Sequence, residues 1–131
     1  MGTTYLMAII KKLPDSRKGK RLKFLIDTGA LYTVAPAHVL RELGIRPHRR
    51  EEFILADGSS VQRRVGMAYF EYKGTGGGAP VIFGEGDDSN LLGVTTLEAM
   101  GLMVDPLSRR LRLLPAMLGY AQLTGEGERE A

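Results

Sequence analysis

One aspartate, Asp27, stands at the end of an apolar run in the stretch FLIDTGALYTV, residues 24–34. Burying a carboxylate at such a place costs free energy unless something compensates for it. Proton transfer by a functional acid is one compensation, and an ordinary Asp-x-Gly turn is another. Gly29 would let the backbone bend close to the acid, and the Thr28 hydroxyl could tie the turn by hydrogen bonding. The motif alone leaves both interpretations open.

Two other sets of side chains could hold a metal ion, but their spacing argues against it. His38 and His48 lie ten residues apart with no third ligand at metal-binding spacing, and His38 is expected on a helix surface. Glu85, Asp87 and Asp88 lie in Glu-Gly-Asp-Asp-Ser, which lacks the spacing of a calcium loop and is typical of a solvated loop. We therefore predict neither a metal nor an organic cofactor.

Glycine-rich and arginine-rich stretches raise the question of phosphate or nucleic-acid binding. The glycines of residues 74–78 precede neither Gly-Lys-Ser/Thr nor a helix start, so we expect a flexible turn and no phosphate site. The run RPHRREE, residues 46–52, ends in two glutamates that partly cancel its charge. The net charge is only +3 and the aromatic residues are few and scattered. We therefore expect no nucleic-acid partner.

The composition is that of one globular domain. A chain of 131 residues with 44% hydrophobic residues can form a single core. The absence of cysteine excludes a disulfide framework, a thiolate metal site and a thiol nucleophile. No window approaches the roughly 18 apolar residues of a membrane span, and no basic region precedes such a stretch. These features predict no membrane association and a cytoplasmic location.

Short extended segments bounded by Gly, Pro and Asp dominate the first half of the chain. Residues 4–13 and 21–26 are predicted strands that pair as a hairpin across the polar turn 14–20. A β-rich segment at 31–34 precedes a short helix that Pro36 opens and Gly44 ends. The side chains predicted to face inward are Leu22, Phe24, Ile26, Val39, Leu40 and Leu43.

A longer hairpin is predicted in the middle of the chain. Residues 51–56 and 60–72 are extended segments, and Asp57-Gly58 between them is a hairpin turn signal. A further strand is expected at 81–83, followed by the polar loop 85–90.

The last ordered elements are a short helix and a pair of strands. After Leu91-Leu92-Gly93, Thr95 and Glu98 have the spacing of a capping box for a helix that ends at Gly101. Residues 102–104 and 111–114 are predicted to pair around Asp105-Pro106. We expect one domain over residues 1–115 and a flexible, charged C-terminal tail over 116–131.

Four of these features, in this order, resemble the retropepsin-like aspartic proteases, the single-lobed group that includes the retroviral proteases. They are LIDTGA at residues 25–30, the hairpin around 54–63, LLG at residues 91–93, and the helix in TTLEAMGL. The stretch LLGVTTLEAMGLMVDP is particularly similar to prokaryotic members. The resemblance spans residues 5–114. It implies a mainly β, closed, barrel-like fold with one or two short helices and one lobe per chain.

The resemblance also implies roles for particular residues. Asp27 would be the catalytic acid, supported by a loop of Thr28, Gly29 and Ala30. In that loop Thr28 would bond across to the partner subunit and Gly29 would admit the substrate backbone. The strand Leu91, Leu92 and Gly93 would brace the loop. Ala56, Asp57, Gly58 and Ser59 would form the tip of a flap that closes over a bound peptide and excludes water.

Peptide hydrolysis of this kind needs two carboxylates, one to accept a proton from water and one to protonate the substrate. The chain carries one Asp-Thr-Gly. Neither Asp57-Gly58-Ser59 nor Asp105-Pro106 has the apolar lead-in and the Thr-Gly turn. We therefore predict a homodimer with Asp27 from each chain at its two-fold interface. Two carboxylates so close would share one proton, which predicts an acidic activity optimum.

Two features depart from the retroviral pattern. Retroviral members commonly carry an acidic residue after Asp-Thr-Gly-Ala and an arginine after the later glycine. Leu31 and Val94 stand at these positions, which suggests an apolar contact in place of the ion pair. The predicted flap tip, residues 56–60, is more polar and less glycine-rich than the retroviral one. Its mobility and the substrate preference therefore do not follow from the resemblance.

The sequence thus predicts an aspartic endopeptidase that hydrolyses peptides or unfolded proteins as a homodimer. It leaves open the cleavage specificity, the physiological substrate, any need for terminal processing and the strands that form the dimer interface. The alternative from another class is a dimeric peptide-binding or scaffold module of the same fold with weak or no hydrolysis. The intact Asp-Thr-Gly motif favours the enzyme.

Overall fold

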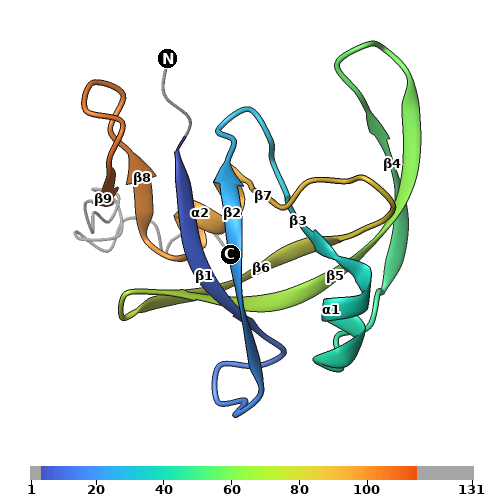
Figure 1. Ribbon diagram of the computed structural model, residues 1–131, viewed down its shortest axis with the longest axis horizontal. Helices are drawn as coiled ribbons and strands as arrows, with labels where there is room; N and C mark the ends of the chain where they lie inside the picture. The colour runs from blue at the N-terminus through green and yellow to red at the C-terminus, as the bar shows by residue number, and fades with distance from the viewer. Residues whose placement is uncertain (1–3, 115–131) are drawn as a thin grey trace, which may run out of the picture.

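Seven strands of the described part of the chain form one curved sheet that closes on itself. The computed structural model describes residues 4–114. In spatial order the strands are β1 (Tyr5–Lys11), β2 (Gly19–Ile26), β7 (Leu91–Leu92), β3 (Thr33–Pro36), β6 (Thr75–Gly84), β5 (Ser60–Tyr72) and β4 (Arg49–Ile54). An additional pairing of β1 with β5 closes the strands from β1 to β5 into a ring and leaves β4 at the edge (Figure 1). The predicted mainly β, barrel-like fold is confirmed.

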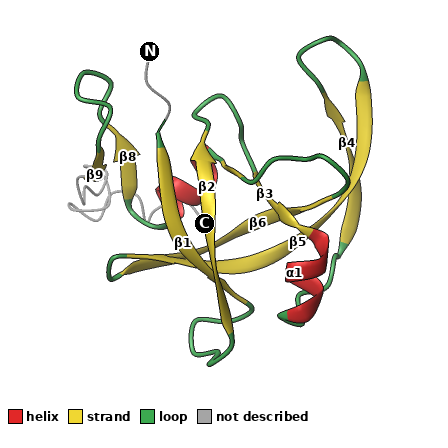
Figure 2. Ribbon diagram, viewed as in Figure 1, coloured by secondary structure: helices red, strands yellow, loops and turns green. Residues whose placement is uncertain are grey.

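Two short helices and a small second sheet complete the described fold. The helices are α1 (Ala37–Glu42) and α2 (Val94–Ala99), and a pair of strands, β8 (Leu102–Val104) and β9 (Leu111–Leu113), follows α2 (Figure 2). The predicted helix after Pro36 and the predicted last strand pair are therefore confirmed. Among residues 4–114 no helix is long and apolar enough to cross a membrane. The predicted tail, residues 116–131, lies outside the described part of the chain.

The core lies inside the ring and follows the alternation of the strands. On β1, Leu6, Ala8 and Ile10 are buried and the residues between them are exposed. Phe24 of β2 and Phe70 of β5 are fully buried and meet edge to face, with ring centroids 6.4 Å apart. Burying each such ring stabilises the fold by about 1.5–3 kcal/mol. The β1–β2 hairpin is the one the sequence predicts.

The glycine-rich stretch at 74–78 was expected to be a flexible turn, and this prediction is wrong for most of it. Gly74 does lie in a turn, with φ +83°, but the glycines at 76–78 belong to β6 and pair with β5. A Cβ at Gly77 would collide with the carbonyl of Ala99 at the end of α2. The glycines therefore allow the helix to pack directly on the strand, a requirement that local composition does not reveal.

The capping box predicted at Thr95 and Glu98 is also wrong. The N-cap of α2 is Gly93, Thr95 lies inside the helix, and no side chain caps its start. The helix does end where predicted, because Gly101 has φ +76° and its N–H donates to the Glu98 carbonyl. The start differs because contacts with the loop after β2, described below, position this end.

The β4–β5 hairpin extends away from the ring (Figure 1). Its strands pair from Arg49 opposite Val65 to Ile54 opposite Ser60. The predicted hairpin around Asp57-Gly58 is therefore confirmed, with its first strand beginning and ending two residues earlier than predicted. At the tip, Gly58 has φ +88° and its N–H donates to the Leu55 carbonyl. The turn therefore needs glycine at this position.

Candidate active site

Asp27 follows β2 and begins a tight loop. Its N–H donates to the Leu92 carbonyl at 3.1 Å, and its Oδ1 accepts the Gly29 N–H at 2.9 Å. Its backbone carbonyl accepts the Ala30 N–H at 3.0 Å. Because β2 and β7 run parallel, with Ile26 opposite Leu92, the strand leads the aspartate directly to this position. The side chain of Asp27 is therefore held in place while it stays half-buried beside a cleft.

The predicted bracing segment lies against this loop. The Val94 N–H donates to the Ala30 carbonyl at 2.9 Å. A Cβ at Gly93 would stand 2.6 Å from the carbonyl oxygen of Tyr32, so only glycine allows this approach. The structure thus brings residues 91–93 and the Asp27 loop together, as the sequence predicts.

Two buried threonines that the sequence analysis missed connect the same elements. The Thr33 and Thr96 hydroxyl oxygens lie 2.6 Å apart, and both residues are fully buried. Thr33 Oγ1 also accepts the Gly93 N–H at 3.0 Å. A buried hydroxyl requires a hydrogen-bonding partner. The position of Thr33 in the apolar segment after the Asp27 loop was therefore the one signal in the sequence that a polar partner lies nearby. This pair fixes the start of α2 against β3.

Leu31 and Val94 stand where retroviral proteases commonly pair two charges. The Leu31 side chain is 60% exposed and lines the cleft. The Thr95 N–H donates to the Leu31 carbonyl at 3.2 Å. Main-chain hydrogen bonds therefore join the loop to α2, and the predicted contact between the two apolar side chains stays a prediction.

The cleft beside Asp27 has a volume of about 650 Å³. One wall is the loop after β2 and the other is the β4–β5 hairpin. Its larger apolar side chains include Leu31, Phe53, Ile54, Leu55, Val61 and Ile82. Ile54 and Leu55 are 71% and 44% exposed. Exposed apolar surface around a few polar groups is typical of a ligand-binding cleft.

The four predicted tip residues lie at or near the end of the hairpin. Ala56 lines the cleft, whereas Asp57, Gly58 and Ser59 form the exposed turn. Asp57 Oδ1 accepts the Ser59 N–H at 2.9 Å and the Ser59 hydroxyl at 2.5 Å. The hydroxyl, followed by the N–H, lowers the pKa of the Asp57 carboxyl.

A salt bridge inside the cleft links the hairpin to the loop 85–90. Arg63 Nε and Nη2 donate to Asp88 Oδ2 and Oδ1 at 2.7 and 3.1 Å, and the Glu85 N–H also donates to Oδ2 at 2.8 Å. The Arg63 hydrogen bond is the main reason that the pKa of Asp88 is lowered. The sequence around Asp88 predicts a solvated loop. No local signal relates it to a partner 25 residues away.

A second set of contacts ties β4 to the Asp27 loop. Arg49 Nη2 donates to the Tyr32 hydroxyl at 3.1 Å and to Glu51 Oε1 at 2.8 Å. The rings of Tyr32 and Phe53 meet edge to face with centroids 6.1 Å apart. The base of the hairpin is therefore attached to the segment that follows Asp27, which sequence reasoning missed.

The two histidines lie on different segments, His38 on α1 and His48 just before β4. His38 is exposed on α1, as predicted, and His48 Nε2 lies 2.8 Å from Arg49 Nη1. In the part of the chain that the structure describes, no three His, Asp or Glu side chains are placed to hold a metal ion.

Comparison with known proteins agrees with this geometry. Residues 16–96, more than half of the chain, match the family model for aspartyl proteases, and the chain belongs to this family. It is similar to the solution structure of the simian foamy virus (mac) protease, with 26% identity and a TM-score of 0.52 over 72% of this chain and 92% of that one. No curated protein sequence matches significantly. The predicted resemblance to retropepsin-like aspartic proteases is confirmed, and the closer likeness to prokaryotic members stays a prediction.

Proposed function

We propose that this chain is an aspartic endopeptidase whose active form is a homodimer with Asp27 from each subunit at the reacting centre. The observation that carries the proposal is the position of Asp27, held by the backbone of β7 at the edge of an apolar cleft. One carboxylate would accept a proton from the attacking water and the other would protonate the substrate. Membership of the aspartyl protease family supports this chemistry.

The dimer follows from the number of acids that the reaction needs. The sequence contains one Asp-Thr-Gly, so a single chain supplies one of the two carboxylates. Thr28 and Gly29 are exposed beside Asp27, which leaves this end of the loop accessible to a second subunit. We propose that Thr28 bonds across the interface and that Gly29 and Ala30 leave room for the substrate backbone.

The substrate would be an extended peptide or an unfolded protein segment. The exposed apolar side chains of the cleft, Leu31, Ile54 and Leu55, suit apolar residues of such a substrate. The hairpin tip from Ala56 to Ser59 would act as a flap over the bound peptide and exclude water from the two acids. The brace formed by Leu91, Leu92 and Gly93 would keep each Asp27 in position.

The test is cleavage of a peptide library, read by mass spectrometry from acidic to neutral pH, by the wild type and by Asp27→Asn. The amide of asparagine keeps an oxygen that can accept the Gly29 N–H, so we expect the variant to fold. Sedimentation and circular dichroism would check that both proteins are folded dimers. Cleavage that peaks in acid and disappears in Asp27→Asn supports the proposal, because paired carboxylates share a proton.

A folded dimer that binds peptides and leaves them intact at every pH would contradict the endopeptidase. It would instead support the alternative, a peptide-binding or scaffold module of the same fold. A folded wild type that cleaves as a monomer would contradict the dimeric site.

A further inference from the structure

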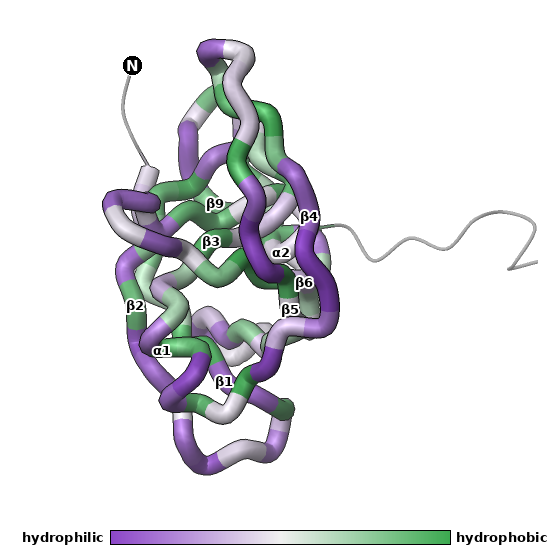
Figure 3. The backbone as a smooth tube through the Cα atoms, turned by 90° about the vertical axis from the view of Figure 1, so that its right-hand side faces the viewer, coloured by the Kyte–Doolittle hydropathy of each residue, from purple (hydrophilic) through white to green (hydrophobic). Residues whose placement is uncertain are grey.

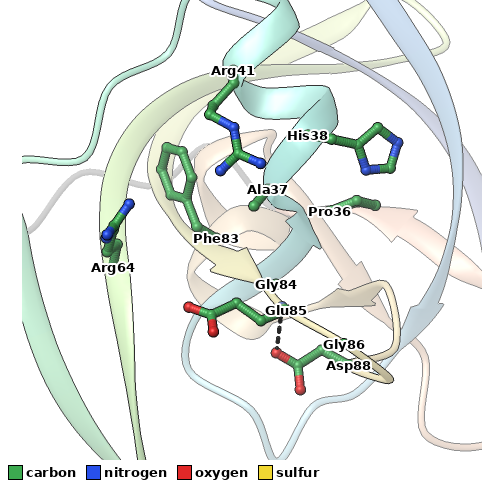
Figure 4. A pocket seen from close by; sticks show the side chains of 10 residues that line it. All are labelled: Pro36, Ala37, His38, Arg41, Arg64, Phe83, Gly84, Glu85, Gly86 and Asp88. Atoms are coloured by element: carbon green, nitrogen blue, oxygen red, sulfur yellow. Dashed lines mark hydrogen bonds between the residues drawn. The ribbon is translucent and has the colours of Figure 1, made fainter.

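A second cavity adjoins the cleft. It has a volume of about 610 Å³ and is bounded by α1, by β5 and by the segment that follows β6 (Figure 4). Pro36, Ala37 and Phe83 give it an apolar lining. Asp88 lines both this cavity and the cleft, so the loop that contains it separates the two. A ligand in either cavity could therefore contact Asp88.

Basic side chains from two separate elements line this cavity. His38 and Arg41 come from α1 and Arg64 comes from β5 (Figure 4). Successive residues of a strand point to opposite faces, which places Arg63 in the cleft and Arg64 in the cavity. We call the surface formed by His38, Arg41 and Arg64 the basic cavity.

The arginines on the two sides of the loop differ in their partners. Arg63 is neutralised by its bidentate contact with Asp88. The guanidinium groups of Arg41 and Arg64 make no hydrogen bond or ion pair with any residue in the described range 4–114. Asp88 is already engaged, and Glu85 helps to raise the pKa of Arg63. With Asp88 paired to Arg63, Arg41 and Arg64 outnumber the one remaining carboxylate of the lining, Glu85, so the basic cavity keeps an excess of positive charge.

Another positive charge lies next to the cavity, on the neighbouring strand β4. Arg64 lies directly opposite Arg50 on β4, and like charges at opposed positions of an antiparallel pair are destabilising. Figure 3 shows that β4 is hydrophilic along this part of the hairpin. A carboxylate bound in the cavity would offset the repulsion between Arg50 and Arg64. It would also give Arg41 and Arg64 a hydrogen-bonding partner.

We propose that the basic cavity binds an acidic side chain of a peptide whose neighbouring residues lie in the cleft. This inference rests on the proposed function, because it extends the peptide-binding surface beyond the cleaved segment. The ligand is a Glu or Asp side chain, because two arginines can offset its single negative charge beside Glu85, whereas Glu85 repels a doubly charged phosphate more strongly. Acidic residues flanking an apolar segment would therefore determine substrate preference.

The first test measures binding to the full chain carrying Asp27→Asn, so that the peptide is not cut. The probes are fluorescein-labelled peptides with an apolar middle and glutamates at one end or the other, each with a glutamine-substituted match. We expect glutamates at one end to strengthen binding about tenfold, the effect of one or two charge-assisted hydrogen bonds. The preference should vanish in the double variant Arg41→Gln/Arg64→Gln.

The matched control is Arg21→Gln, which removes one charge from an exposed position on β2 that lines neither cavity. It should keep the preference for glutamate. Equal affinity for the glutamate and glutamine peptides at both ends would overturn the inference. So would a preference that survives in the folded double variant. Thermal unfolding would check that both variants fold.

The second test compares KM for the same peptides with the wild type, which separates this inference from the proposed function. A glutamate preference in binding without any cleavage rejects the endopeptidase and supports the basic cavity as a peptide-binding site. Asp27-dependent cleavage with no glutamate preference supports the endopeptidase and overturns the basic cavity. When both hold, the KM ratio between matched peptides falls toward one in Arg41→Gln/Arg64→Gln.

Discussion

Asp27 and Asp57 make the same local turn in different surroundings. Asp27 Oδ1 accepts the Gly29 N–H and Asp57 Oδ1 accepts the Ser59 N–H, each at 2.9 Å. The Asp27 loop connects β2 to β3 and is tied to the backbone of both β7 and α2. The Asp57 turn ends an exposed hairpin, and its additional bond comes from its own Ser59. The local motif is shared, so the contacts made by distant segments distinguish the candidate active site from a simple chain reversal.

The largest expected difference between the two turns is in catalysis. Asp27→Asn should lower kcat/KM for peptide cleavage by about a thousandfold or more, because under the proposed function it removes a group that transfers protons. Asp57→Asn should change it by less than about tenfold, since its carboxylate acts only on the shape of the hairpin tip. Steady-state cleavage by both folded variants provides the comparison. Equal losses would show that Asp57 belongs to the reacting centre.

The glycines of the two regions should differ in stability. Gly93→Ala should lower the free energy of unfolding by about 3 kcal/mol, because the new Cβ would meet backbone atoms of Leu31 and Tyr32 that cannot move independently. Gly58→Ala should cost about 1 kcal/mol, since its φ is +88° but the space around it is open. Urea unfolding measures both values. A smaller loss at Gly93 would mean that the loop moves away from α2 without penalty.

The hydroxyls of the two regions should show a smaller difference. Thr33→Val removes the acceptor of the buried Gly93 N–H and the partner of Thr96, so we expect a loss of about 2 kcal/mol. Ser59→Ala removes an exposed hydroxyl and should cost less than about 0.5 kcal/mol. Urea unfolding at neutral pH tests the pair. Similar small losses would show that the threonine pair does not hold α2 in place.

The smallest effect concerns pH and the salt bridge between the hairpin and the loop 85–90. The folded-state pKa of Asp88 is lowered chiefly by Arg63, so its stabilisation is present above the unfolded pKa, about 4, and is lost as the pH falls through the folded value. The pair is partly exposed, which limits the contribution to about 0.5 kcal/mol. The stability difference between the wild type and Asp88→Asn should therefore be largest near neutral pH and disappear in acid.

The control for this pH profile is Asp15→Asn, in the exposed turn between β1 and β2. It should leave the urea midpoint close to that of the wild type near neutral pH. If the Asp88→Asn difference stays constant into acid, the carboxylate charge is not its cause. If the difference grows as the pH falls, the sign of the linkage is wrong.

Local patterns predicted those elements that local physics controls. The β1–β2 alternation, the turn at Gly58 and the helix between Pro36 and Gly44 were all predicted, because side-chain period, positive φ and proline geometry act over a few residues. The wrong predictions concern features that depend on segments distant in the sequence. The glycines at 76–78 and the start of α2 at Gly93 depend on which segment packs against them.

The sequence by itself determined the Asp27 motif, the order of the strands along the chain and the family to which the chain belongs. Only the tertiary structure decided that Thr33 meets Thr96, that Arg63 is neutralised by Asp88, and that Arg41 and Arg64 face one cavity. The physical reason is the separation along the chain over which each interaction acts. Backbone conformation and burial period are encoded by neighbouring residues, whereas the partner of a polar group far along the chain is set by how the closed sheet brings distant strands together.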